Sequence, residues 1–267
     1  MPQELIQLLL SGLAVGLVAG AMAGTVAGIA GIGGGLIYVP VFYLTMPGNQ
    51  ESLSIHIMAS LVAVAVTGYF SARAHWRLGH LNMSAFRQLA PGLMVGAAIG
   101  LWSTLKIPEF VILFALAFLD AWIAWDYGRA QKQMRTVPLT TMSGPVGYIS
   151  GALGIGGGTM LVPLLRRMIS LREAVGTSAA CGMVMAIAAV LFNLLLEPVW
   201  FSLISEQLYF LAAVMIGILL IIPRTSGWSA KLHAALPELQ MQFILKTLFI
   251  LLSTGLFFSA LLSLISR

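Results

Sequence analysis

Charged residues are the scarcest class in this sequence. Asp, Glu, Lys and Arg make up only 9% of its 267 residues, whereas a soluble domain carries about 25%. Because so few charges leave too little polar surface to coat a globule in water, the composition argues against a soluble protein. Cysteine is almost absent as well: Cys181 stands alone, which excludes an intramolecular disulfide. What remains is an apolar chain, 59% hydrophobic.

The apolar residues form runs of the length that crosses a lipid bilayer. A spanning helix needs about 20 mostly apolar residues. The first run follows Glu4 without a basic residue, and it is longer than the core of a secretory signal, so we do not interpret it as one. The chain is predicted to be an all-α, polytopic membrane protein. Its predicted helices cover residues 5–29, 53–72, 84–105, 108–125, 138–153, 174–196, 208–222 and 241–265.

One glycine-rich segment occurs twice. Residues 28–40 (GIAGIGGGLIYVP) return as residues 151–163 (GALGIGGGTMLVP), a constant 123 positions later, and eight of the thirteen residues are identical. Each copy leads into a short apolar piece, at 36–46 and 159–168. A helix of about 10 residues rises only about 15 Å, roughly half the hydrocarbon thickness, so these pieces are predicted half-helices. The duplication divides the chain into two transmembrane repeats, 1–128 and 129–267.

The basic loops predict how the two repeats are oriented. Lys and Arg gather around 73–87, 129–135, 166–172 and 224–231, whereas 45–54 and 197–207 have none. Cytoplasmic loops carry the excess of Lys and Arg in membrane proteins. This rule makes 5–46 a re-entrant hairpin from the outside and 138–168 one from the cytoplasm, each followed by about three transmembrane helices. The second repeat is then inverted, as in many secondary transporters. Residues 5–29 are long enough to cross alone, so the span count stays open.

Two clusters of consecutive glycines are the predicted functional centre. A helix N-terminus favours an anion, since it carries about half a positive charge and unpaired N–H groups. Glycines leave these groups bare, and non-helical backbone at membrane depth is tolerated where it lines a cavity. In an inverted repeat the two half-helix N-termini meet near the midplane. We therefore predict that the clusters bind a small anion through their backbone: Gly33, Gly34 and Gly35, and Gly156, Gly157 and Gly158.

Other glycines have a different explanation. Glycine recurs at every fourth residue from Gly12 to Gly28 and from Gly92 to Gly100. Such stripes let helices approach closely, so we assign these two runs to packing. A nucleotide-binding loop is excluded at the consecutive glycines, because no Lys-Ser or Lys-Thr follows and no strand is predicted before them.

The doubled pattern Gly-x-Gly-Gly-Gly-x-x-x-Val-Pro, with Ala174-Val-Gly-Thr-Ser178 after the second copy, resembles the sulfite exporter TauE/SafE family of membrane permeases. The resemblance extends from about Leu5 to Leu264. It implies a transporter of sulfite, sulfonates or related organosulfur anions in the cytoplasmic membrane of bacteria or archaea. An anionic substrate agrees with the argument from the helix termini, which rests on the residues alone.

Hydroxyl side chains follow both half-helices. Thr177 and Ser178 follow the second copy, and Ser60 is the hydroxyl that matches them after the first. We expect these three to assist the glycines in binding the substrate, with the second repeat holding it more tightly. The alternative is that each hydroxyl bonds a carbonyl one turn earlier in its own helix.

Three basic or titratable residues are candidates for coupling or gating. His56 precedes Ser60 by four residues and shares its helix face, so its titration would couple transport to protons; the alternative is an interfacial histidine that faces water. Arg73 and His75 fall in a stretch that resembles the family's basic segment, which implies a gate. A solvated loop is the alternative for His75.

Two more candidates lie inside apolar runs. Asp120 is the one acidic residue well inside such a run, and an ionisable group there is costly and a candidate for function. It is about two turns from Arg129, so reaching the interface is the alternative. Cys181, one turn after Thr177, is a minor candidate for contact with a sulfur-containing anion, and packing among small residues is the alternative.

The absence of several motifs narrows the possible functions. No paired histidines indicate a metal site, no acid pair or nucleophile–base set indicates an enzyme, and no cofactor is expected. The net charge of +5 lies in short loops and does not indicate nucleic acid. We predict a proton-coupled, alternating-access transporter of small sulfur-containing anions in the inner membrane, with the anion and the lipid bilayer as its partners. An anion channel, a membrane partner that anchors another protein, and a homodimer stay open.

Overall fold

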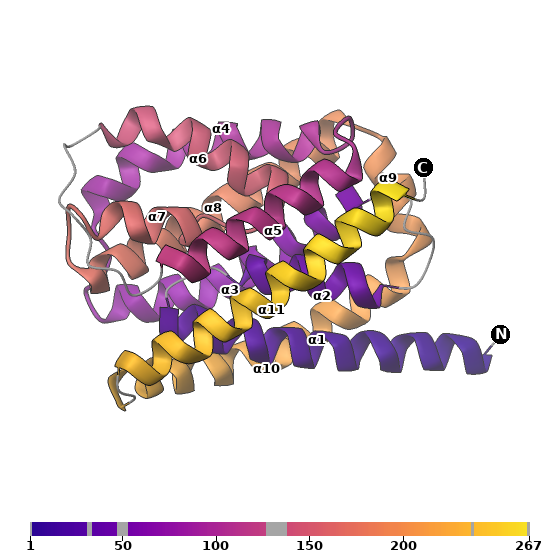
Figure 1. The fold of residues 1–267 in the computed structure, drawn as a ribbon, viewed down its shortest axis with the longest axis horizontal. Helices are drawn as coiled ribbons and strands as arrows, with labels where there is room; N and C mark the ends of the chain where they lie inside the picture. The colour runs from indigo at the N-terminus through magenta and orange to yellow at the C-terminus, as the bar shows by residue number, and fades with distance from the viewer. Residues whose placement is uncertain (1, 31–33, 47–52, 127–137, 236–237, 266–267) are drawn as a thin grey trace.

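The structure is a computed structural model, and it describes residues 2–30, 34–46, 53–126, 138–235 and 238–265. Every element in these ranges is a helix, which confirms the all-α prediction (Figure 1). The boundary between the predicted repeats, at 128 and 129, lies outside the described residues. The helices are α1 (Pro2–Ala30), α2 (Gly35–Thr45), α3 (Leu53–Arg77), α4 (Met83–Ser103), α5 (Glu109–Asp126), α6 (Leu139–Leu153), α7 (Gly158–Leu165), α8 (Leu171–Leu196), α9 (Val199–Glu206), α10 (Leu208–Ala235) and α11 (Glu238–Ile265).

One element differs from the prediction. The prediction of a loop over 197–207 is wrong, because α9 forms there and buries Trp200 completely. The first helix has the length that the sequence indicates. α1 has 29 residues and would rise about 40 Å, enough to cross the hydrocarbon core on its own, whereas α6 has only 15 residues.

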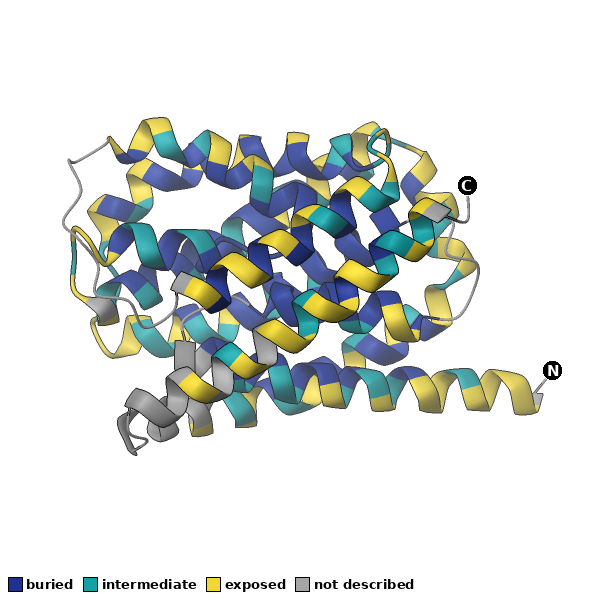
Figure 2. Ribbon diagram, viewed as in Figure 1, coloured by how far each residue is buried: buried dark blue, intermediate teal, exposed yellow. Residues whose placement is uncertain are grey.

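Four helices in the described ranges are long and apolar enough to cross a membrane: Gln3–Ala27, Leu53–Arg77, Arg172–Leu196 and Leu208–Ser226. Large apolar side chains cover the outside of the bundle, with Leu195 at 83% and Phe118 at 74% exposure. Figure 2 shows the exposed positions along the outward faces of α1 and α11, with buried positions behind them. An outside built from such residues is suited to lipid rather than to water. The chain is a polytopic membrane protein.

Glycine stripes pack the helices in two parallel pairs. α1 runs alongside α10, so that Gly12 lies against Phe210 and Gly20 against Ile218. In the same way α4 runs alongside α6, so that Gly96 lies against Gly144 and Gly100 against Tyr148. A Cβ added at Gly147 would come within 2.5 Å of the Leu93 carbonyl oxygen, so the backbones touch. The packing role predicted for these stripes is confirmed where the structure describes them.

The two halves also meet along antiparallel pairs. Between α5 and α11, the rings of Phe114 and Phe257 lie 5.5 Å apart, and the Ser253 hydroxyl donates to the carbonyl of Ala117 at 2.9 Å. α3 and α8 cross in the same sense, with Gly68 against Met183. The bundle thus contains two parallel pairs, α1 with α10 and α4 with α6, and two antiparallel pairs, α5 with α11 and α3 with α8.

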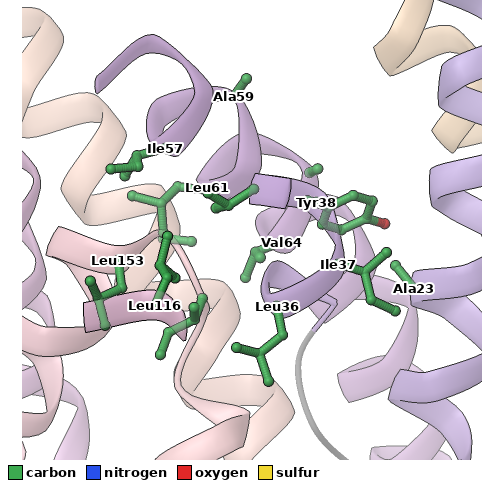
Figure 3. Close-up of a cluster of buried hydrophobic side chains, with 14 of the residues drawn as sticks. Ala23, Leu36, Ile37, Tyr38, Ile57, Ala59, Leu61, Val64, Leu116 and Leu153 are labelled. Carbon is green, nitrogen blue, oxygen red and sulfur yellow. The ribbon is translucent and has the colours of Figure 1, made fainter. Parts of the chain in front are cut away.

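The core lies where the short helices enter the bundle. Leu36 at the start of α2, Leu61 on α3, Leu116 on α5 and Leu153 at the end of α6 belong to one buried cluster (Figure 3). All but Leu153 are at most 1% exposed, and Leu153 is 7% exposed. This packing fixes the glycine-rich turns in the middle of the molecule.

Candidate functional site

The second glycine-rich segment is a turn that only glycine adopts easily. α6 ends at Gly154, which has φ of 67°, and Gly156 has φ of 67° as well. Positive φ is rare for residues with a Cβ and ordinary for glycine. Gly157 then begins α7 with no side-chain hydrogen bond to its first turn. The first N–H groups of α7 therefore depend on something other than a side-chain cap.

The first segment approaches the second through its backbone. Gly34 is the N-cap of α2, also without a side-chain hydrogen bond to the first turn, and it packs against Ala23, which lies two turns before the end of α1. A Cβ added at Gly35 would meet the backbone of Ile155 and lie 2.5 Å from the carbonyl oxygen of Gly154. Close contact therefore explains glycine at this position. Gly33 lies outside the described residues.

Both segments line one narrow cavity. Gly34 lines it from the first glycine-rich segment, and Gly156, Gly157 and Gly158 line it from the second. α3 and α8 supply the remaining walls, apart from Ala27 of α1. The cavity has a volume of about 20 Å³, which is room for about one water molecule. The other lining residues are Val64, Thr67, Gly68, Ser71, Ser178, Ala179, Gly182 and Met183.

The three predicted hydroxyls are placed differently. Ser178 lines the cavity and bonds the Val175 carbonyl of its own helix at 3.0 Å. The Ser60 hydroxyl donates instead to the Gly154 carbonyl at 2.6 Å and holds the second glycine turn against α3. Thr177 accepts a hydrogen bond from the backbone N–H of Asn82 at 2.9 Å and so ties α8 to the start of α4. The structure brings only Ser178 to the cavity wall.

Two hydroxyls that line the cavity were missed in the sequence. Thr67 and Ser71 continue the helix face that begins at Ser60, and extending that face by about three turns would have found them. The Thr67 hydroxyl donates to the Ala63 carbonyl at 2.8 Å. Because Thr67 has only one proton, the Tyr38 hydroxyl is the donor in the 2.7 Å bond between the two side chains. This bond connects α2 to the cavity wall.

The coupling and gating candidates lie around this centre. His56 is 5% exposed and its ring packs edge-on to Tyr43, with centroids 5.7 Å apart; the alternative of a histidine facing water is wrong. His75 packs against His80, with ring centroids 5.8 Å apart. Arg73 is exposed on α3, one turn before Arg77 at the end of the helix.

Asp120 and Cys181 are both fully buried. Asp120 lies on α5 with 0% exposure, and neither carboxyl oxygen has a hydrogen-bond partner among the described residues. The alternative that Asp120 reaches the aqueous interface is therefore wrong. Cys181 is buried on α8 and does not line the cavity. Its position fits the alternative of packing among small residues.

Two short helices that begin at one cavity, in a bundle with an apolar outside, define the class of protein. Broken helices that begin at a shared site are typical of membrane transporters. Neither a metal cluster nor a strand occurs in the described ranges.

The comparisons with known proteins identify the family. The family described as Sulfite exporter TauE/SafE matches residues 16–256, and the chain belongs to it. A probable membrane transporter protein of Haemophilus influenzae is 34% identical over 218 residues, which cover 77% of this chain and 81% of the relative. The probable inner membrane transporter protein TsaS of Comamonas testosteroni is 34% identical over 164 residues, 60% of this chain and 62% of that protein. No solved structure matches.

Proposed function

We propose that this membrane transporter carries small sulfur-containing oxyanions, such as sulfite or a small sulfonate, by alternating access. The observation that supports this most is the single cavity lined by both glycine segments. The N–H groups at the start of α2 and α7 would bind the anion, because both helix termini present partial positive charge to the same space. Ser178 adds a hydroxyl from α8. The family to which the chain belongs supports a sulfur-containing substrate.

The directions of the helices support two inverted repeats, residues 1–128 and 129–267. α3 runs toward Arg77 at the basic end, and α4 returns from it; α6 is parallel to α4 and so starts at the basic end. α10 runs toward Arg224, and α1 is parallel to it. The α1–α2 and α6–α7 hairpins thus enter the bundle from opposite ends, and the positive-inside rule places the basic end in the cytoplasm.

The size of the cavity supports a mechanism with moving walls. About 20 Å³ is too little for an oxyanion of several heavy atoms. Binding therefore requires α3 and α8, which carry most of the lining, to separate. Rocking of one repeat against the other would open the cavity to one side at a time.

Asp120 and His56 are our candidates for proton coupling. The buried carboxyl group of Asp120 has no hydrogen-bond partner among the described residues, so its ionised form is costly in a membrane. Asp120 would therefore bind and release a proton during each transport cycle. Leu116, one turn earlier, belongs to the buried cluster beside the second glycine turn, with Leu153 and Ile155. His56 lies on α3 one turn before Ser60, whose hydroxyl holds that turn.

Reconstitution tests this proposal. Purified protein in liposomes should take up labelled sulfite, thiosulfate or sulfoacetate, and an imposed pH gradient should change the rate. An excess of unlabelled substrate inside should accelerate uptake, because a carrier exchanges its substrate across the membrane. Rapid flux without this counterflow would identify a channel. Absence of flux with all three anions would contradict the proposal.

A further inference from the structure

A second hollow lies beside the cavity, on the side of the bundle where the basic residues gather. It is a groove of about 360 Å³ between α3, α8 and the start of α4. Its walls are apolar or aromatic, including Tyr69, Trp76 and Phe86. Arg73 is the only charged residue that lines it among those described. A single fixed cation at the edge of an apolar groove attracts small anions and repels small cations.

Met183 is the wall that the groove and the cavity share. Its side chain on α8 lines both hollows, and it is neither fully buried nor fully exposed. Across from it, α3 carries Gly68, where an added Cβ would lie 3.0 Å from the Cβ of Met183. An added Cβ at Gly68 would also lie 3.2 Å from the Cα of Met183, so α3 and α8 are in backbone contact there and the Met183 side chain stands beside that contact. Methionine has three rotatable bonds and adapts easily to new surroundings.

Neighbouring residues of α3 line the cavity and the groove. Thr67, Gly68 and Ser71 face the cavity, and Ala72 and Arg73 face the groove in the next positions along the helix. A path along α3 from the cavity to the groove would therefore run past the hydroxyls of Thr67 and Ser71, then Met183, and then the guanidinium group of Arg73.

We propose that Met183 is the gate of the anion cavity and that the groove ending at Arg73 is its vestibule on the basic side of the membrane. The occupant of the groove is the same small anion that the cavity binds, drawn there by the charge of Arg73. This inference rests on the proposed function for the identity of the anion. The evidence for the route is that Met183 lines both the cavity and the groove. Arg73 acts on capture of the anion, and Met183 acts on its passage.

Cysteine labelling tests the route without requiring transport. Cys181 is replaced by serine, and Met183→Cys becomes the only thiol. Two methanethiosulfonate reagents of similar size, one with a sulfonate and one with a trimethylammonium group, are applied from the basic side, and labelling is followed by mass spectrometry. We expect the anionic reagent to react about fivefold faster than the cationic one, as one nearby charge would produce. Arg73→Gln should abolish this preference.

A neighbouring position supplies the control. Val184 lines neither hollow, so Val184→Cys in the same background should label slowly and without preference for charge. Equal rates at Met183→Cys for both reagents, or a preference that survives Arg73→Gln, would overturn the proposal. A groove filled by a lipid chain would give slow labelling with both reagents, which also overturns it.

Flux measurements separate the two roles. For substrate added on the basic side, Arg73→Gln should raise KM about fivefold with Vmax nearly unchanged. Met183→Trp should lower Vmax, because the larger side chain cannot clear Gly68. If wild-type protein carries the anion but Arg73→Gln does not raise KM and Met183→Trp does not lower Vmax, the proposed route is wrong and the transport function stands. If wild-type protein carries no anion, the function fails while labelling still tests the gate.

Discussion

At the scale of single residues, the glycines of the doubled segment have two different roles. Gly35 is held in backbone contact with Ile155 of the other segment. Gly157 has an ordinary helical φ of −62° and faces the cavity. The first lets two backbones touch, and the second puts no side chain into the cavity. We expect substitutions to distinguish the two positions, with a change at Gly35 lowering stability and a change at Gly157 weakening binding of the proposed anion.

Gly35→Ala should destabilise the protein. The added methyl group meets the backbone of Ile155, which cannot rotate away, and overpacking of this kind costs about 1–3 kcal/mol. The melting temperature in detergent should fall by several degrees. Gly144→Ala on α6 is the matched control, since a Cβ there meets nothing within 4 Å, and helical alanine is more stable than glycine. Equal melting temperatures for the two variants would contradict the contact.

Substitutions of Ser60 and Ser178 should also differ, one changing stability and the other changing substrate binding. Ser60→Ala leaves the buried carbonyl of Gly154 without its 2.6 Å hydrogen bond, which costs about 1–3 kcal/mol. Ser178→Ala removes a hydroxyl that bonds only its own helix and lines the cavity. We expect Ser60→Ala to lower the melting temperature, and Ser178→Ala to raise KM several-fold at unchanged melting temperature. Thermal unfolding and uptake kinetics on both variants check this, and the reverse assignment would contradict it.

At the scale of helices, the glycine stripes decide which helices pair. Gly16 of α1 lies against the backbone of Val214 on α10. Gly16→Val should force the two helices apart and lower the melting temperature by about 2–10 °C, from an overpacking cost of about 1–3 kcal/mol. The KM for substrate should stay near that of wild type, since neither Gly16 nor Val214 lines the cavity. An unchanged melting temperature would show that α1 and α10 can separate without loss of stability, which would contradict this prediction.

Much of this helical organisation could be predicted from the sequence. The apolar runs and the two short pieces after the glycines predict the positions of most helices closely, because the length and hydropathy of a segment determine whether it forms a membrane helix. α9 was missed, since its eight residues lie between two helices and its folding depends on burying Trp200. The roles of Ser60 and Thr177 were also beyond the sequence. Which hydroxyl faces the cavity depends on how α3 and α8 cross, and that is a tertiary contact.

At the scale of the whole molecule, the pairing of the helices predicts two hairpins that enter from opposite sides. Single cysteines in a Cys181→Ser background test this arrangement. Ser205 on α9 and Met168 after α7 are both exposed and lie at opposite ends in the proposed topology. An impermeant maleimide should label Ser205→Cys in intact cells and Met168→Cys only after permeabilisation. Labelling of both in intact cells would contradict the inverted repeats.

The most direct test of anion binding by the glycine backbone is the uptake rate of Gly182→Ala in liposomes. Gly182 lines the cavity, and a Cβ there would lie 3.4 Å from the backbone nitrogen of Gly157, in ordinary contact. The methyl group would cover that N–H without strain and would favour the helix by about 0.5–1 kcal/mol. Gly255→Ala on α11, where a Cβ meets nothing within 4 Å, is the control.

We expect the Gly182→Ala protein to melt at or above the wild-type temperature and to take up sulfite about tenfold more slowly at low concentration, as loss of one charge-assisted hydrogen bond would produce. Gly255→Ala should match wild type in both measurements. Wild-type uptake by a stable Gly182→Ala protein would contradict the central claim that the glycine backbone binds the anion.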